Sequence, residues 1–173
     1  MRKELSYSVW LMPAGRTKEK LSKIISSLSK KYSSPTFRPH VTLAGGIAGS
    51  EKELTRKAEK LSKTLKPFTV HLGRVRYLDE FFRSLFIAVK KTPEYMDAYE
   101  KSREVFDLPE NHGYLPHMSL IYGDFSRATK EEIIKKTGRN FHESFEARRI
   151  FFVFNNEKEK KWTVIKKFSL KSP

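Results

Sequence analysis

Two short segments of the chain repeat the same set of residues that could do chemistry. The first is Phe37–Leu43 (FRPHVTL) and the second is Tyr114–Leu120 (YLPHMSL), and both read aromatic-x-Pro-His-apolar-hydroxyl-Leu. A glycine follows each segment at the same offset, at Gly46 and Gly123. The second copy starts nearly half a chain length after the first, so the repeat predicts an internal duplication that presents the same groups twice.

The spacing within each segment places the polar groups on one face of a strand. Side chains at i and i+2 of a β-strand point the same way, so His40 lies beside Thr42, and His117 lies beside Ser119. The residues between them are apolar and are expected to be buried. Two such strands lying side by side would bring two imidazoles and two hydroxyls into one groove.

This set of groups suits the hydrolysis of a cyclic phosphodiester. An imidazole titrates near pH 6.5, so both of its protonation states are available near neutrality. One histidine can take a proton from water while the other protonates the leaving oxygen, and such transfers contribute roughly 10²–10⁴-fold in rate. The hydroxyls of Thr42 and Ser119 can donate to the non-bridging oxygens, where charge builds up. The residues alone do not say which histidine is the base.

Two H-x-[ST] motifs with these flanks resemble those of the two-histidine (2H) phosphoesterases, and their contexts resemble the cyclic phosphodiesterase branch known from plants and yeast. The resemblance is carried by Phe37–Thr42 (FRPHVT), Leu115–Tyr122 (LPHMSLIY) and Tyr7–Pro13 (YSVWLMP), and it spans nearly the whole chain. It implies a metal-independent enzyme without a cofactor. The implied substrates are nucleoside 2′,3′-cyclic phosphates and ADP-ribose 1″,2″-cyclic phosphate.

The same resemblance implies roles for individual residues. In the plant enzymes, the histidine of the second motif activates water and that of the first protonates the leaving 3′ oxygen. Matched by position, His117 is then the base and His40 the acid. Metal binding is the rival role for this pair, but no third ligand accompanies either motif, so no metal is expected.

Three further residues are implied to bind the substrate: Tyr122, Trp10 and Phe82. Tyr122 would face away from Ser119 in a regular strand, unless the loop at Gly123 turns it toward the site. Trp10 matches a residue that borders the substrate in the family. Phe82 would stack on a nucleobase, an interaction that contributes about 1–3 kcal/mol. Core packing is the alternative for both Trp10 and Phe82.

The net charge of +15, from 35 basic and 20 acidic residues, suits an anionic substrate and makes RNA a further candidate partner. Solvated lysine-rich helices are the plainer explanation. Two alternative functions therefore remain open. One is an RNA-end enzyme acting on 2′–5′ linkages or 2′,3′-cyclic termini, and the other is a non-catalytic module that binds RNA or nucleotides.

Other features of the composition set the expected cellular context. The chain has no cysteine, which excludes disulfides, thiolate metal sites and cysteine nucleophiles. It has no apolar run long enough for a membrane span, and its start lacks the apolar region of a signal peptide. We therefore expect a cytoplasmic protein that does not bind membranes and acts as a monomer.

The hydrophobic patterns predict an α+β fold with the order strand, helix, motif strand, helix, strand in each half. We expect one domain over residues 1–173, built as two pseudo-symmetric lobes with a hinge near residues 78–83. Two antiparallel sheets would line a central cleft, with the helices packed outside.

Several local signals mark the ends of the predicted elements. Ser50, Thr92 and Thr129 are predicted to cap helices, and so is Thr17. Gly45-Gly46 is predicted to end the first motif strand, and a change in alternation at Gly73 predicts a β-bulge.

Overall fold

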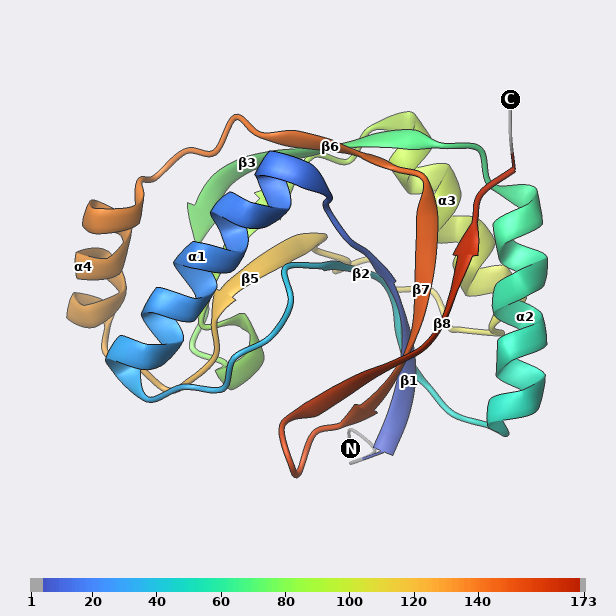
Figure 1. The fold of residues 1–173 in the computed structure, drawn as a ribbon, viewed down its shortest axis with the longest axis horizontal. Helices are drawn as coiled ribbons and strands as arrows, with labels where there is room; N and C mark the ends of the chain where they lie inside the picture. The colour runs from blue at the N-terminus through green and yellow to red at the C-terminus, as the bar shows by residue number, and fades with distance from the viewer. Residues whose placement is uncertain (1–4, 172–173) are drawn as a thin grey trace.

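The computed structural model describes residues 5–171, which form eight strands and four α-helices (Figure 1). The strands are β1 (Leu5–Leu11), β2 (Val41–Ile47), β3 (Phe68–Arg76), β4 (Leu85–Val89), β5 (His117–Ile121), β6 (Ser144–Ala147), β7 (Arg149–Asn156) and β8 (Lys161–Ser169). The helices are α1 (Gly15–Tyr32), α2 (Glu51–Thr64), α3 (Pro93–Val105) and α4 (Arg127–Thr137), with a 3-10 turn at Phe81–Arg83.

The eight strands form a single sheet, so the prediction of two separate sheets is wrong. Their order is β6-β3-β4-β5-β2-β1-β7-β8, and every neighbouring pair is antiparallel. The sheet curls into a half-barrel, as Figure 1 shows. The two motif strands, β2 and β5, pair at its centre through Val41 and Met118. This short contact joins what the sequence pattern presents as two sheets.

The two halves of the chain also exchange strands. β3, the last strand of the first half, pairs with β4 and β6 of the second half. β7, from the second half, pairs with β1 of the first. Each group of strands around a motif is therefore completed by the other half of the chain, and neither half forms its own sheet.

The helices pack against the curled sheet in two pairs (Figure 1). α1 packs against β5 and lies near α4, and Lys31 of α1 forms an ion pair with Glu132 of α4 at 3.4 Å. α2 and α3 contact each other on the other side, where α2 packs on β7 and β8 and α3 on β2 and β3. Burial of their apolar faces forms the main core, to which β2 contributes Val41 and Leu43 and β5 contributes Met118.

Two of the predicted helix caps are confirmed. The Ser50 hydroxyl accepts a hydrogen bond from the Glu53 backbone N–H at 3.3 Å, at the start of α2. The Thr92 hydroxyl accepts one from the Tyr95 N–H at 3.2 Å, with Pro93 as the first residue of α3. Each cap satisfies a backbone donor that a helix start leaves without a partner.

The other two predicted caps are wrong. α1 begins two residues before Thr17, and its N-cap residue makes no side-chain capping bond. α4 begins before Thr129, because Ser126 is its N-cap and accepts from the Thr129 N–H at 3.1 Å. A hydroxyl three residues upstream competes for the same role, and local spacing alone cannot rank the two.

The glycines in the strands give one confirmed and one wrong prediction. The pairing of β3 with β4 shifts register between Leu72 and Val75, which confirms the bulge at Gly73. A side chain at Gly73 would meet the Ala88 carbonyl at 3.3 Å. By contrast, β2 does not end at Gly45-Gly46 but continues to Ile47, which pairs with Tyr7 of β1.

Candidate active site

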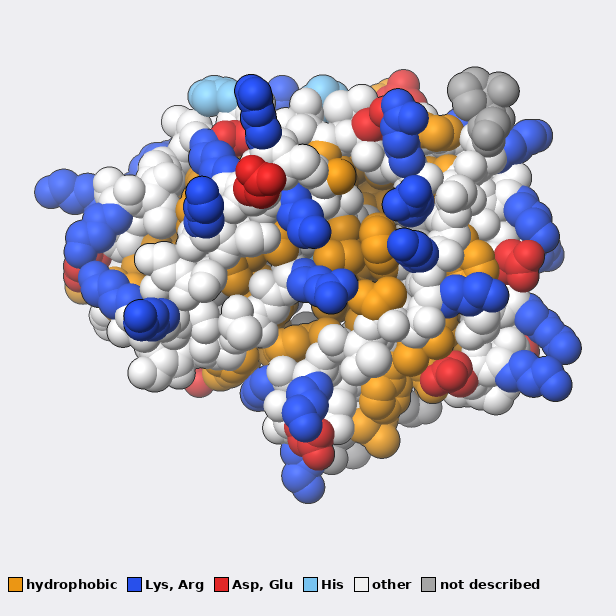
Figure 2. Space-filling view, viewed as in Figure 1, with side chains coloured by type: hydrophobic (Ala, Val, Ile, Leu, Met, Phe, Trp, Pro, Cys, Tyr) orange, Lys and Arg blue, Asp and Glu red, His pale blue; other side chains and the backbone are white. Residues whose placement is uncertain are grey.

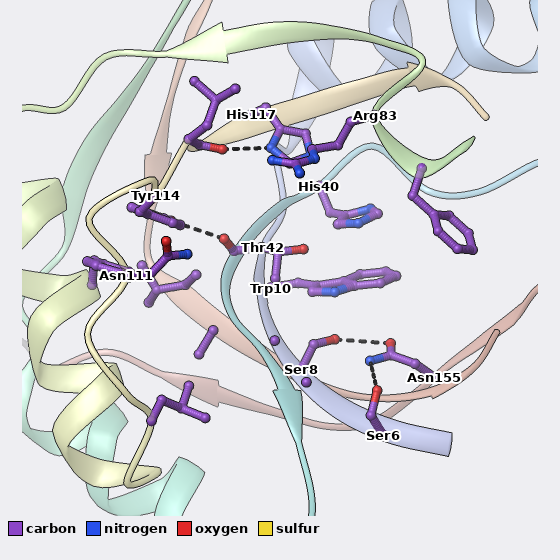
Figure 3. Close-up of a pocket in the computed structure, with 18 of the residues that line it drawn as sticks. Ser6, Ser8, Trp10, His40, Thr42, Arg83, Asn111, Tyr114, His117 and Asn155 are labelled. Atoms are coloured by element: carbon purple, nitrogen blue, oxygen red, sulfur yellow. Dashed lines mark hydrogen bonds between the residues drawn. The ribbon is translucent and has the colours of Figure 1, made fainter. Parts of the chain in front are cut away.

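The pairing of β2 with β5 sets the relative positions of the four motif side chains. Its antiparallel register puts Thr42 opposite His117. The same register, continued one step before β2, puts His40 opposite Ser119. The two histidines thus lie on a diagonal, for which a typical Cα separation is about 7–8 Å. All four side chains line one cleft of about 680 Å³, shown in Figure 3.

Each histidine makes the same backbone hydrogen bond through Nδ1. His40 Nδ1 lies 2.7 Å from the carbonyl oxygen of Arg38, and His117 Nδ1 lies 2.8 Å from that of Leu115. A proline follows both carbonyl residues and restricts them to extended conformations, which fixes the direction of the carbonyl. A carbonyl only accepts, so Nδ1 carries the proton and Nε2 of a neutral ring is the acceptor.

His40 is the more buried of the two rings. Only 7% of its surface is exposed, and its ring stacks on Trp10 with centroids 3.5 Å apart and an interplanar angle of 8°. Burial lowers the pKa of His40 to about 4. The hydrogen bond to the Arg38 carbonyl raises this pKa by less, and the nearby His117 lowers it slightly further. In the ligand-free site, the His40 imidazole is therefore neutral at pH 7.

The buried His40 is expected to make stability depend on pH. The unfolded imidazole takes up a proton near pH 6.5, whereas the folded one does so near 4, so the unfolded state binds more protons in between. The free energy of unfolding should thus fall by about 3 kcal/mol as the pH drops from 6.5 to 4. Urea unfolding at several pH values measures this slope, and His40→Asn should flatten it.

An exposed histidine provides the control for this slope. His142 is exposed, so His142→Asn should leave the slope of the wild-type protein unchanged. An equal slope in wild type and His40→Asn would show that other groups cause the acid sensitivity.

His117 is half-buried and lies over the side of β4 that faces the cleft. Its ring packs against Phe86 with centroids 5.0 Å apart, and its backbone pairs with Ala88. Arg83 lines the same cleft and is labelled in Figure 3. The Arg83 guanidinium donates to both carboxylate oxygens of Glu80 at 2.8 Å, which holds this cation at the edge of the cleft.

The hydroxyls near the two rings already take part in hydrogen bonds. Ser119 Oγ donates to the Phe82 carbonyl at 3.2 Å, so it must rotate to reach a ligand. Tyr122 lies close enough to Ser119 to interact with it, and burial raises the pKa of the Tyr122 phenol, which stays protonated and can donate. Thr42 is half-buried at the floor of the cleft. Three hydroxyl donors thus surround the space beside the histidines.

The aromatic residues of the two motifs, Phe37 and Tyr114, make different contacts. Phe37 packs near His40, with ring centroids 6.1 Å apart and an interplanar angle of 81°. Tyr114 instead stacks on Tyr99 at 3.7 Å and donates a hydrogen bond from its hydroxyl to the Thr42 carbonyl at 3.2 Å. Tyr114 therefore connects Tyr99 of α3 to the backbone of β2, so the two motifs differ at this position.

Three aromatic side chains that line the cleft, Tyr122, Phe82 and Trp162, form what we call the aromatic wall, and Phe37 packs on one of them. Tyr122 stacks on Phe37 at 4.0 Å, and Trp162 lies 5.5 Å from Tyr122. Phe82 meets both Tyr122 (5.2 Å) and Trp162 (6.5 Å) edge-on. β5 ends before Tyr122, and Gly123, at φ +144°, turns the chain there. Tyr122 consequently faces the cleft and not the opposite face of the sheet.

The structure brings every residue proposed from the sequence to this cleft: His40, Thr42, His117, Ser119, Tyr122, Trp10 and Phe82. It adds residues that the sequence analysis did not single out, chiefly Trp162, Ser6, Ser8 and Asn155. The sequence pattern could have indicated the two serines, because Ser6 and Ser8 stand at alternate positions before Trp10 and so share its face of the strand. Trp162 and Asn155 join the cleft only through the pairing of β7 with β1 and β8.

Beyond the cleft, charged side chains cover much of the surface. Figure 2 shows lysine and arginine spread across the face that carries α1, α2 and β8, with few acidic side chains and without a single continuous track. Between residues 5 and 171, no three His, Cys, Asp or Glu side chains are grouped to hold a metal. In the same part of the chain, no helix is long and apolar enough to cross a membrane.

Comparison with known proteins gives a consistent family. The model of the family described as cyclic phosphodiesterase-like protein matches residues 5–172. A cyclic phosphodiesterase of Arabidopsis thaliana is 30% identical over 130 residues, which cover 75% of this chain and 72% of that protein. A 2′,3′-cyclic-nucleotide 3′-phosphodiesterase of Yarrowia lipolytica is 30% identical over 157 residues, covering 68% and 73%.

Solved structures share the fold at low sequence identity. The protein TT0787 of Thermus thermophilus matches with a TM-score of 0.66 and 14% identity over 96% of this chain and 98% of that one. E. coli LigT complexed with 3′-AMP matches with a TM-score of 0.66 and 11% identity, over 98% and 99%. These neighbours have the same mixed α/β architecture with a curled antiparallel sheet.

Proposed function

Since the chain belongs to the cyclic phosphodiesterase-like family of the 2H phosphoesterases, and is a phosphodiesterase, we propose that it hydrolyses nucleoside 2′,3′-cyclic phosphates. ADP-ribose 1″,2″-cyclic phosphate, which carries the same strained ring, is the related substrate. The observation that carries the proposal is the diagonal pair of His40 and His117. Both rings are held by Nδ1, so Nε2 is the nitrogen that can exchange a proton with the substrate.

The reaction requires one proton acceptor and one proton donor on opposite sides of phosphorus. A water oxygen attacks phosphorus in line as one Nε2 removes its proton. The bond from phosphorus to one ribose oxygen breaks, and that oxygen takes a proton from the other histidine. The product is a nucleoside monophosphate, and the two histidines have exchanged protonation states. Two rings on a diagonal across β2 and β5 suit this in-line geometry.

We assign His117 as the base and His40 as the acid, following the plant enzymes that the chain resembles. The low pKa of His40 in the ligand-free site places a condition on this assignment. A bound phosphate anion favours the charged imidazole, so substrate must raise the pKa of His40 before it can donate. The face of Trp10 against the ring also favours the cation.

Charge on the non-bridging oxygens needs donors that are already in place. Thr42 and Ser119 supply two hydroxyls next to the histidines, and Tyr122 supplies a third. Ser119 gives up its bond to the Phe82 carbonyl when it turns toward phosphate. The ring of Phe82, within the aromatic wall, can stack on the nucleobase. No metal or cofactor takes part in this scheme.

Phosphorus NMR of a reaction with 2′,3′-cyclic AMP tests the proposal. We expect the cyclic phosphate signal to be replaced by that of a single monoester, the 2′-phosphate if His40 protonates the 3′ oxygen. Added EDTA should leave the rate unchanged. Binding without turnover would instead favour a non-catalytic nucleotide-binding module, and a rate abolished by EDTA would contradict the metal-independent scheme.

An RNA-end enzyme is the second candidate, supported by the extent of the cleft. The cleft continues past Thr42, on the side away from Trp10, to Asn111 and Tyr114 (Figure 3). This space could hold a nucleotide upstream of the cyclic phosphate. Comparing mononucleotide and oligonucleotide substrates over a range of salt concentrations decides between the two. Preference for oligonucleotides with a steep salt dependence would favour the RNA-end function.

A further inference from the structure

We propose that Ser6, Ser8 and Asn155, here called the polar triad, bind the hydrogen-bonding edge of the substrate's nucleobase. This inference deepens the proposed function and rests on it, because it concerns the part of the substrate beyond the cyclic phosphate. It gives the cleft a second region with a task of its own, specificity for the base.

The triad lies on the floor of the cleft, on the same face of the sheet as the catalytic groups. Ser6, Ser8 and Trp10 follow one another at alternate positions of β1, so they share a face, and each step is about 6.6 Å. Asn155 of β7 is the neighbour of Ser6 across the sheet. Trp10 in turn pairs with Thr42 of the first motif. The triad therefore begins one step beyond Trp10, on a continuous surface leading away from the phosphate site.

Three polar side chains are buried together here without an apparent need from the fold. Ser6 is 5% exposed, Ser8 2% and Asn155 8%, and all three line the cleft. Apolar residues of similar size would pack at such positions without the cost of burying polar atoms. A cluster of buried hydroxyl and amide groups that faces an open cleft is typical of the few polar groups that orient a ligand.

The hydrogen bonds within the triad leave part of the amide available. The Ser8 hydroxyl donates to Asn155 Oδ1 at 3.1 Å, and Asn155 Nδ2 donates to Ser6 Oγ at 3.3 Å. An amide has two N–H donors and two acceptor lone pairs. Within residues 5–171, one N–H and one lone pair of Asn155 remain without a protein partner. The serines fix the orientation of the amide, so the side chain presents a donor beside an acceptor.

The aromatic wall begins next to the triad. Trp162 is the neighbour of Asn155 across β7 and β8, and it contacts the Phe82 ring at 6.5 Å. A nucleobase stacked on this wall has its edge toward the floor of the cleft, where Asn155 lies. Stacking accepts any base, whereas a paired donor and acceptor can discriminate between base edges. The two groups together provide both parts of base recognition.

Changing the amide to a carboxylate gives a sharp test. Asn155→Asp replaces the donor by a second acceptor, and guanine is the base that offers two adjacent donors, N1–H and N2–H. The ratio of kcat/KM for 2′,3′-cyclic GMP to that for 2′,3′-cyclic AMP should therefore rise about 10-fold or more over wild type, from the 1–3 kcal/mol of a bidentate pair. Asn156→Asp, with the same charge change on the opposite face of β7, is the matched control and should leave the ratio unchanged.

A base-free substrate separates this inference from the proposed function. Methyl riboside 2,3-cyclic phosphate lacks the base, so its kcat/KM should be the same in wild type and Asn155→Asp. If wild type hydrolyses no cyclic phosphate, the proposed function fails. If wild type is active and folded Asn155→Asp keeps the wild-type ratio, the inference about the triad is overturned.

A second variant keeps the test decisive if Asn155→Asp does not fold. Ser8→Ala removes the hydroxyl that orients the amide but leaves the amide itself. The advantage of cyclic AMP over the base-free substrate should then fall several-fold, with kcat for the base-free substrate unchanged. An unaltered advantage in Ser8→Ala would equally overturn the inference.

Discussion

Replacing His117 by alanine should lower kcat for 2′,3′-cyclic AMP by about 10²–10⁴-fold, and His40→Ala should do the same, since each variant loses one proton transfer. The double variant should lose far less than the product of the two, because the histidines act as a unit on one phosphorus atom. Steady-state kinetics on the purified variants measures both effects. His142→Ala, at an exposed position outside the cleft, is the control.

The same variants can identify the acid. In a substrate with sulfur in place of the 3′ ribose oxygen, the leaving group is a thiolate, which needs no protonation. If His40 is the acid, His40→Ala should regain most of its lost rate on this substrate, and His117→Ala should not. Rescue of His117→Ala alone would reverse the two roles. Folded variants that both keep wild-type turnover of cyclic AMP would falsify the proposed function itself.

The site could be predicted from the sequence because its chemistry lies in short local patterns. An i, i+2 pair of histidine and hydroxyl shares a face in any strand, and the repeat of that pair supplied the second half of the site. The i−2 carbonyl that holds each Nδ1 is also local, since it belongs to the residue before the motif proline. Neither feature depends on how the sheet is ordered.

The sheet order could not be predicted in the same way, because it depends on contacts between distant segments. The alternation of β3 and β7 fixes which face of each strand is buried, but not which strand lies next to it. The exchange of these strands between the halves, and the single pair Val41–Met118 that joins them, appear only in the folded chain. Asn155 and Trp162 were missed for this reason, since pairing alone brings them to the cleft.

Phe86 illustrates how the fold supports the chemistry, and its replacement has the second largest expected effect. Its side chain is 0% exposed, and it lies on the cleft face of β4, where its backbone pairs with Ser119 and its ring contacts His117 at 5.0 Å. Phe86→Ala should lower the free energy of unfolding by about 3–5 kcal/mol through lost burial and the cavity left behind. It should also lower kcat about 10-fold or more, because His117 loses the ring against which it is positioned.

A second buried phenylalanine separates these two effects. Phe152 of β7 is also 0% exposed, but it belongs to the main core and stacks on Tyr7 at 5.1 Å. Phe152→Ala should cost a similar free energy of unfolding while the folded protein keeps nearly wild-type kcat. Urea unfolding measures the free energy of unfolding of Phe86→Ala and Phe152→Ala. Steady-state kinetics under mild conditions, where both variants remain folded, compares their kcat values. Equal losses of kcat would mean that activity follows global stability, and that Phe86 does not position His117.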